Sequence, residues 1–192
     1  MNTAAHIAIN SFVLGRGRFA RFAWPIASGA LLPDLPMLVF YAYQRGWLHA
    51  PERAIWSQAY FLPQWQTFFD AFNSLPLIAL AAFFAWRAKR PAWLACLASM
   101  ALHCVADLCL HNEDAHGHFW PLSDWHFRSP ISYWDPRRHG AIFVWLELAA
   151  SVASCVALWR RRGSWRAIGA ATGALYALGI AIALLMWSGL AA

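Results

Sequence analysis

Charged side chains are scarce in this sequence. Asp, Glu, Lys and Arg make up 12% of its 192 residues, whereas hydrophobic residues make up 60% and the mean hydropathy is +0.42. Ordinary soluble domains carry about a quarter charged residues, so this chain has too little polar surface to cover a water-soluble core. The composition predicts an integral membrane protein. It excludes intrinsic disorder, a collagen-like repeat and a disulfide-stapled secreted fold.

Cysteines and common catalytic motifs are also few. The four cysteines lie inside apolar stretches, which favours buried small side chains over disulfides or a thiolate cluster. The sequence has no glycine-rich phosphate loop and no Gly-x-Ser-x-Gly nucleophile motif. Covalent catalysis by serine or cysteine is therefore disfavoured.

The net charge of +6 comes from basic residues that cluster at the ends of apolar stretches. Such clusters mark the cytoplasmic ends of membrane helices, so the basicity indicates topology and argues against nucleic-acid binding. The three clusters are Arg16, Arg18 and Arg21; Arg87, Lys89 and Arg90; and Arg160, Arg161, Arg162 and Arg166.

The apolar stretches between these clusters predict an all-α fold, a polytopic transmembrane helical bundle in a single domain over residues 1–192. Five long spans are expected at 22–43, 68–86, 91–110, 141–159 and 167–190, and a short N-terminal membrane helix at 3–14. Pro25, Pro33 and Pro36 predict that the first long span is kinked. Two extracytoplasmic loops are expected at about 44–67 and 111–140.

Polar side chains inside the spans are the first functional candidates, because each ionisable group costs at least about 2.5 to 3.5 kcal/mol near a helix centre. Counting about 1.5 Å per helical residue from the cytoplasmic arginines gives the depth of each one. His6, Asp34, Asn73, His103 and Glu147 fall at about 15 to 21 Å, and Asp70 and Asp107 at about 26 Å. The sequence therefore predicts one polar layer from the middle of the membrane to its outer half.

The sharpest motif begins in the third long span and continues past its end. His103, Asp107, His111 and Asp114 are spaced four, four and three residues apart, which aligns them on one face of a continuing helix. Imidazole nitrogens and carboxylate oxygens at one-turn spacing suit a divalent metal, with Zn²⁺ favoured and Mn or Fe as alternatives. His116 and His118 are further candidate ligands. The alternatives are a buried His–carboxylate pair for His103 and Asp107, and a solvated loop for the others.

Four other polar residues have open roles. Asp34 stands where flanking prolines break the helix. Broken helices at membrane depth occur mainly where they line a cavity enclosed by the protein, so Asp34 is a candidate ligand. Asp70 and Asn73 share a helix face and are either ligands or groups that orient ligands. Glu147 is either a general base or a structural partner. Asp107, Asp114 and Glu147 are the candidate proton acceptors.

The loop that follows is rich in aromatic and basic residues. Trp120 and its neighbouring aromatic residues suit a membrane interface. Arg128, Arg137 and Arg138 lie on the non-cytoplasmic side, against the usual charge trend, and are candidates for binding a lipid phosphate. Ordinary ion pairs with nearby acidic residues are the alternative.

A family resemblance is carried by His6, the Gly-x-x-x-Pro-Asp segment that ends at Asp34, the pair His103-x-x-x-Asp107, and Trp120-Pro121. Over residues 1–125 the chain resembles the membrane-bound metal-dependent hydrolases of the YdjM type. The resemblance implies a polytopic inner-membrane fold with an intramembrane metal site whose ligands are His6, Asp34, His103 and Asp107. The chain departs from that family where Asn73 stands in place of a histidine.

A more distant likeness concerns the order His, Asp, His-x-x-x-Asp, His, which is similar to the zinc-dependent phospholipase C and nuclease group. That likeness implies hydrolysis of a phosphate ester. The resulting hypothesis is a multi-pass protein of the bacterial inner membrane, with a metal site toward the periplasmic side, that hydrolyses an amphiphilic lipid or isoprenoid phosphoester with metal-activated water. The alternative is a non-enzymatic membrane protein that binds or transports a metal ion or proton. The partners implied are membrane lipid and an amphiphilic substrate.

Overall fold

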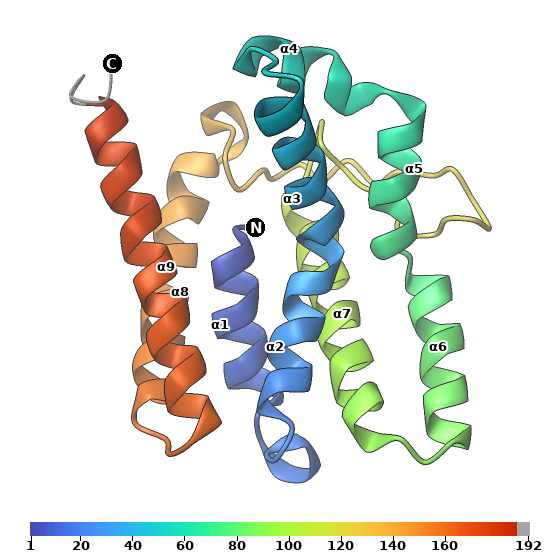
Figure 1. Cartoon of the computed structure of the whole chain (residues 1–192), viewed down its shortest axis with the longest axis vertical. Helices are drawn as coiled ribbons and strands as arrows, with labels where there is room; N and C mark the ends of the chain where they lie inside the picture. Colours follow the sequence, from blue (N-terminus) through green and yellow to red (C-terminus); the bar gives the residue numbers. More distant parts are fainter. Residues whose placement is uncertain (188–192) are drawn as a thin grey trace.

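The structure, a computed structural model, describes residues 1–187, and side chains through residue 181. Over that range it contains helices and no strand, and Figure 1 shows the longer helices side by side in a bundle. Four stretches are long and apolar enough to cross a membrane: Ala23–Trp47, Pro63–Arg87, Pro91–Leu110 and Gly140–Trp159. These findings confirm the predicted all-α fold and show four of the five predicted spans as helices long and apolar enough to cross a membrane.

The predicted fifth span, 167–190, falls on helix α9 (Ser164–Trp187). Its last three residues, 188–190, lie outside the described part of the chain. Helix α9 packs along α8 (Gly140–Trp159), and Gly169 allows this, since a Cβ there would lie 2.9 Å from the Cys155 carbonyl oxygen.

Large apolar side chains face outward over much of the bundle. Leu80, Phe84 and Trp145 are 53%, 61% and 69% exposed. Contiguous apolar surface of this kind is unfavourable in water and suits lipid, so the exposed faces agree with the four candidate spans.

Helix α1 (Thr3–Leu14) lies at the centre of the bundle. It packs against α2 (Ala23–Leu31), α7 (Pro91–Leu110), α8 and α9. The buried residues Ala4, Ala5 and Ala8 make this possible, because their small side chains let neighbouring backbones approach closely. The helix is short, and the N-terminus lies midway along the bundle (Figure 1).

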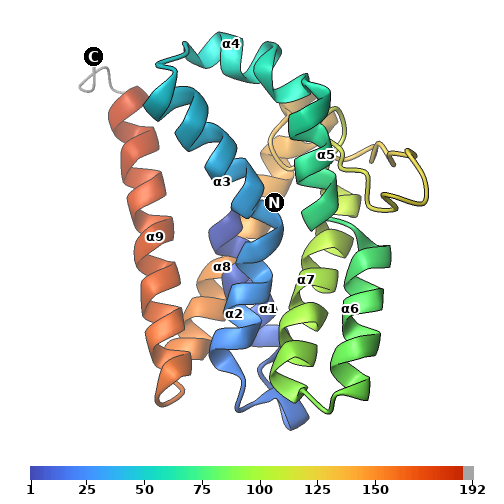
Figure 2. The ribbon, with the colours of Figure 1, turned by 45° about the vertical axis from the view of Figure 1, so that its right-hand side comes forward.

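The basic clusters all lie at one end of the bundle. Figures 1 and 2 show the turn before α2, the turn between α6 (Leu75–Arg87) and α7, and the turn between α8 and α9 at the lower end. Helix α4 (Glu52–Ser57) and the long loop between α7 and α8 lie at the opposite end. Depths measured along the helices from these arginines therefore refer to the same end of the bundle.

The chain from Ala23 to Trp47 is a helix with an interruption at Asp34. Helix α2 ends at Leu31, a 3-10 turn covers Leu32–Asp34, and α3 (Leu35–Tyr41) leads into a π-helical turn, Ala42–Trp47. Pro33 and Pro36 lack the amide hydrogens that a regular helix needs here, so the predicted break occurs beside the aspartate.

The predicted span 68–86 lies within the candidate span Pro63–Arg87, but its helix is not continuous. Helix α5 (Pro63–Phe72) begins five residues earlier, and it is separated from α6 (Leu75–Arg87) at Asn73 and Ser74. Ser74 caps α6 by accepting a hydrogen bond from the Leu77 amide, and Pro76 fits the first turn of the new helix. The long loop satisfies backbone groups at this break, since the Leu75 amide donates to the His118 carbonyl.

The two predicted loops differ in structure. Residues 44–67 contain α4, a 3-10 turn at Ala59–Phe61 and the start of α5, and they are held by a hydrophobic cluster of Phe40, Ile55, Tyr60 and Phe69. Between α7 and α8 the described chain is irregular apart from a 3-10 turn at Pro136–Arg138. These two segments cover the end of the bundle above α1 and α7.

A buried polar contact joins α1 to α7 and allows a test of the packing. The Asn10 amide donates to the Ser99 carbonyl at 2.9 Å and to the Ser99 hydroxyl at 3.1 Å. We expect Asn10→Ala to destabilise the protein by about 1 to 2 kcal/mol in a detergent unfolding titration, because buried acceptors lose their donor. The matched control is Ser11→Ala, whose buried hydroxyl has no hydrogen-bond partner. Equal destabilisation by both variants would contradict this account.

Candidate metal centre

Three histidines surround the carboxylate of Asp107. The Nε2 atoms of His6 and His111 lie 2.9 and 3.2 Å from Oδ1, and Nε2 of His103 lies 2.8 Å from Oδ2. The amino group of Met1 also contacts Oδ1, at 3.0 Å. His6, His103 and Asp107 are almost completely buried, and one donor atom from each lies within 4.8 Å of the others. These three residues form a group that could hold a metal ion.

The orientation of His103 is fixed by the backbone of α2. Its Nδ1 lies 2.8 Å from the Ala30 carbonyl oxygen, so Nδ1 carries the proton and donates it. Its ring also stacks on that of His6, with centroids 3.5 Å apart. Gly29 lets α2 approach α7 this closely, because a Cβ at that position would overlap the Cys96 carbonyl group. Nε2 of His103 is therefore the free nitrogen, and it faces Asp107.

Asp34 lies beside this group. Its Oδ1 is 3.5 Å from Nε2 of His103, and its Oδ2 is buried without a hydrogen-bond partner. The preceding residue is held in place by Asn73, whose amide donates to the Pro33 carbonyl at 3.2 Å. The break in the helix thus brings a second carboxylate to the free nitrogen of His103, and Asn73 supports the backbone that carries it.

His111 and Asp114 join the group although α7 ends at Leu110. The His111 amide still donates to the Asp107 carbonyl, which places His111 as the next turn would. Its Nδ1 lies 2.9 Å from Oδ2 of Asp114, and Trp134 donates to the same oxygen at 3.0 Å. Burial would raise the pKa of Asp114, but the contacts from His111 and Trp134 outweigh it and hold that pKa well below its usual range. Asp114 is therefore ionised at neutral pH.

The donor atoms fit a divalent cation. Nε2 of His103 has no hydrogen-bond partner, although two carboxylate oxygens lie within 3.5 Å of it. A nitrogen lone pair that faces two carboxylates is unfavourable unless a positive charge, either a proton on Nε2 or a metal ion, lies between them. In the described part of the chain no Lys or Arg pairs with Asp34 or Asp107. Imidazole nitrogens held at their far side by a carbonyl or carboxylate are the usual arrangement around Zn²⁺.

The remaining histidines of the loop lie near His111. The ring of His116 is 5.5 Å from that of His111, and its Nδ1 is buried without a hydrogen-bond partner. Burial, reinforced by His111, lowers the pKa of His116 to about 3, so this ring is neutral at neutral pH. His118 is positioned by the helix break, since its Nδ1 lies 3.0 Å from the Asn73 carbonyl oxygen.

A cavity of about 480 Å³ opens beside the metal-ligand candidates. His111, Asp114 and His116 lie in its wall. A smaller cavity of about 250 Å³ contacts Asp34 and shares His111 with the first. The rest of the larger cavity's wall is mainly aromatic: Met37, Trp56, Tyr60, Phe61, Tyr133 and Trp134, with Glu113. The apolar, aromatic chamber therefore reaches the edge of the donor group at His111, whereas His6, His103 and Asp107 do not line it.

Other predicted site residues lie elsewhere. Asp70 accepts a hydrogen bond from the Gly117 amide at 2.6 Å and lies 3.6 Å from His126, so it holds the long loop. Glu147 accepts from the Tyr176 hydroxyl at 2.7 Å and from the Asn2 amide at 3.2 Å, and it is not part of the group around Asp107.

The predicted substrate-binding residues do not line the chamber. Arg137 pairs with Asp135 at 3.1 Å, and Arg128 is exposed. The backbone carbonyls of Arg138 and Trp120 accept hydrogen bonds from Ser132 and Ser74. These residues therefore help to shape the loop.

The sequence reasoning missed part of the site. Met37, Trp56, Tyr60 and Phe61 line the chamber, but Met37 was expected only as part of a span and the other three only as part of an extracytoplasmic loop. Asn10 was missed as well, although a polar side chain inside the apolar stretch 3–14 is the same signal that identified His6. The contact between the Ala30 carbonyl and His103 depends on how α2 and α7 pack together, and no pattern in the sequence indicates it.

No family model, no curated protein and no solved structure matches this chain.

Proposed function

We propose that this protein is a membrane-embedded, metal-dependent hydrolase that acts on a lipid or isoprenoid phosphoester. The observation that carries the proposal is the convergence of three histidine Nε2 atoms on the Asp107 carboxylate, deep in a bundle of apolar helices. Buried groups of this chemistry, in a chain with few charges, are costly unless they bind a cation.

His6, His103 and Asp107 would hold the ion, with Asp34 and His111 completing the set. A bound divalent metal supplies two kinds of chemistry: it lowers the pKa of a water molecule and it polarises the substrate oxygen. Zn²⁺ is the favoured ion because imidazole and carboxylate ligands suit it.

The protein groups around the metal position the reactants. The Ala30 carbonyl and Asp114 orient His103 and His111 through their Nδ1 atoms. Asp114 is ionised and lies in the chamber wall, so one of its carboxylate oxygens is the candidate acceptor for a proton from attacking water. The aromatic wall excludes water from the rest of the chamber.

The chamber favours an amphiphilic substrate. Its aromatic wall can pack against an acyl or isoprenoid chain, while His111 and Asp114 meet the polar end. The chamber is lined by residues of α3, α4 and the loop between α7 and α8, and α4 and that loop lie at the end of the bundle opposite the three basic turns (Figure 1). If those turns are cytoplasmic, as the positive-inside rule predicts, the substrate enters from the periplasmic side of a bacterial inner membrane.

The test is elemental analysis combined with a hydrolysis assay. Protein purified in detergent should contain Zn, Mn or Fe in roughly equimolar amount, and should release phosphate or a phosphorylated headgroup from mixed micelles of a phospholipid or an isoprenoid phosphate. A chelator should abolish hydrolysis, and added Zn²⁺ should restore it. Full hydrolysis by metal-free protein would overturn the proposal. Equimolar metal without hydrolysis of either substrate class would support a non-enzymatic metal-binding protein instead.

A further inference from the structure

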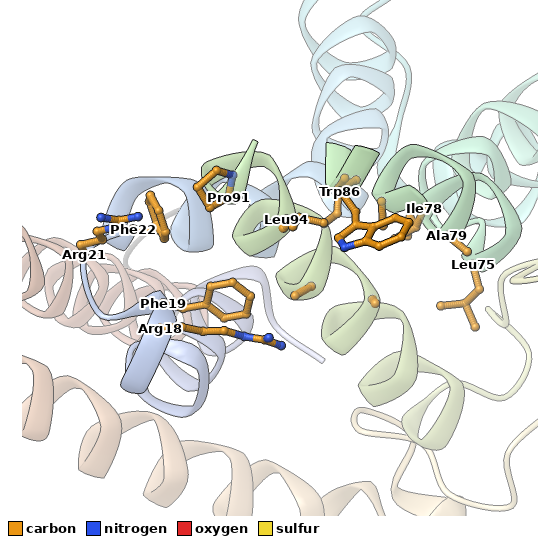
Figure 3. A pocket seen from close by; sticks show the side chains of 14 residues that line it. Arg18, Phe19, Arg21, Phe22, Leu75, Ile78, Ala79, Trp86, Pro91 and Leu94 are labelled. Carbon is orange, nitrogen blue, oxygen red and sulfur yellow. The ribbon is translucent and has the colours of Figure 1, made fainter. Parts of the chain in front are cut away.

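A third cavity lies at the opposite, basic end of the bundle. It has a volume of about 720 Å³ and runs between α6, α7 and the turn before α2. Figure 3 shows Arg18 and Arg21 on one side of it and Leu75, Ile78 and Ala79 on the other. We call this cavity the α6–α7 groove. It shares no residue with the two cavities next to the metal-ligand candidates.

The groove has the dimensions and chemistry of a site for an acyl chain. Along α6 its lining extends from Leu75 to Trp86, which are 11 residues apart and so about 17 Å apart at the helical rise. Alanines on both helices, such as Ala79 and Ala98, leave room for a chain between the larger apolar side chains. The outer face of α6 around the groove carries exposed Phe83 and Phe84, so the groove opens where lipid is expected.

The charge is concentrated at one end of the groove. Arg18 and Arg21 are exposed and, in the described part of the chain, neither forms a salt bridge. Their guanidinium groups lie over the rings of Phe19 and Phe22, at 5.1 and 4.8 Å from the ring centroids. Among the described residues that line the groove none is acidic. Two guanidinium groups beside an apolar channel complement an anionic headgroup attached to an acyl chain.

We propose that the α6–α7 groove binds an acidic phospholipid, with its phosphate at Arg18 and Arg21 and one acyl chain along α6. Basic pockets between membrane helices at the end rich in Lys and Arg are the usual sites for anionic headgroups. The turn between α6 and α7, with Arg87, Lys89 and Arg90, adds positive charge at the same end. The site involves none of the metal-ligand candidates, so lipid binding in the groove does not depend on the proposed hydrolase activity.

Native mass spectrometry of the whole protein tests this directly. The protein is released from detergent after incubation with phosphatidylglycerol or phosphatidylcholine of the same chain length. We expect phosphatidylglycerol to remain bound at about 10-fold lower lipid concentration than phosphatidylcholine, since each arginine near a headgroup favours the anionic lipid. Equal retention of the two lipids would overturn the proposal.

Charge variants test the headgroup contact. The double variant Arg18→Gln/Arg21→Gln should weaken retention of phosphatidylglycerol by about 10- to 30-fold. The matched control is Arg160→Gln/Arg162→Gln, which removes the same charge from exposed positions at the same end of the bundle. If both double variants weaken retention equally, binding reflects overall charge and the groove is not the site.

Apolar variants test the acyl-chain contact without altering charge. Ala79→Phe fills the groove and should weaken retention of phosphatidylglycerol, whereas Ala81→Phe, on the same helix but outside the groove lining, should not. This pair decides the question even if the arginine variant fails to fold. Inorganic phosphate at equal concentration should not displace the lipid; displacement would show that the site recognises phosphate alone.

Discussion

Replacing His103 with Asn should remove the bound metal while the fold is retained. The Asn amide can still donate to the Ala30 carbonyl, as His103 Nδ1 does at 2.8 Å, but it cannot reach the position of Nε2. We expect metal content to fall below about a tenth of the wild-type value and hydrolysis to fall by about 10³-fold, because the metal contributes several kcal/mol. Elemental analysis after gel filtration and thermal unfolding of the same sample measure both properties.

Two further variants separate ligand loss from structural damage. His103→Leu also leaves the Ala30 carbonyl without its donor, so thermal stability should fall together with metal content. His126→Asn changes a histidine whose side chain is 36% exposed, and this variant should retain the wild-type thermal stability and metal content. Wild-type metal content in the His103→Asn protein would show that this nitrogen is not a ligand.

The depth of the site was predictable because the helical rise is fixed. Counting from the arginines put His6, Asp34 and His103 in one layer, and the structure brings their side chains together around one point. The basic turns lie at a common end of the bundle, which supplies the shared reference that the counting requires. The common depth of these three candidate ligands therefore followed from local sequence alone.

The rotation of each helix was not predictable from the sequence in the same way. Glu147 was counted to the same depth as His103, yet it contacts Tyr176 and Asn2. Asn73 was also counted to that depth, and it supports the Pro33 carbonyl. Depth depends on the rise per residue, but the direction of a side chain around the bundle depends on which helices pack together. Those contacts are long-range and have no signature in a single span.

The loop after α7 shows a different limit. Helical spacing predicted that His111 and Asp114 would follow His103 and Asp107 on one face, but the helix ends at Leu110. The residues still meet, because the His111 amide keeps its bond to Asp107 and the turn brings Asp114 back to His111. The spacing therefore identified residues whose side chains lie together, while the irregular backbone that joins them could not be inferred from periodicity.

Gly29→Ala should damage both the stability of the bundle and the metal centre. A Cβ at position 29 would lie 2.8 Å from the carbonyl carbon of Cys96, and this backbone group can retreat only if α7 moves away from α2. Overpacking of this kind costs about 1 to 3 kcal/mol or more. Separation of the two helices would also break the 3.5 Å approach of Asp34 to His103, so metal affinity should fall by about 10- to 100-fold. Thermal unfolding and metal titration of the purified variant measure the two effects.

Gly46→Ala is the matched control for this substitution. A Cβ at Gly46 meets nothing within 4 Å, so the same chemical change should leave metal affinity unaltered. Its effect on stability should have the opposite sign, a gain of up to about 1 kcal/mol, because alanine restricts the unfolded chain more than glycine does. If the two variants behaved alike, close contact between α2 and α7 would not be what positions Asp34 against His103. Loss of metal affinity in Gly29→Ala but not in Gly46→Ala would show that the metal centre depends on the close backbone contact between Gly29 and Cys96.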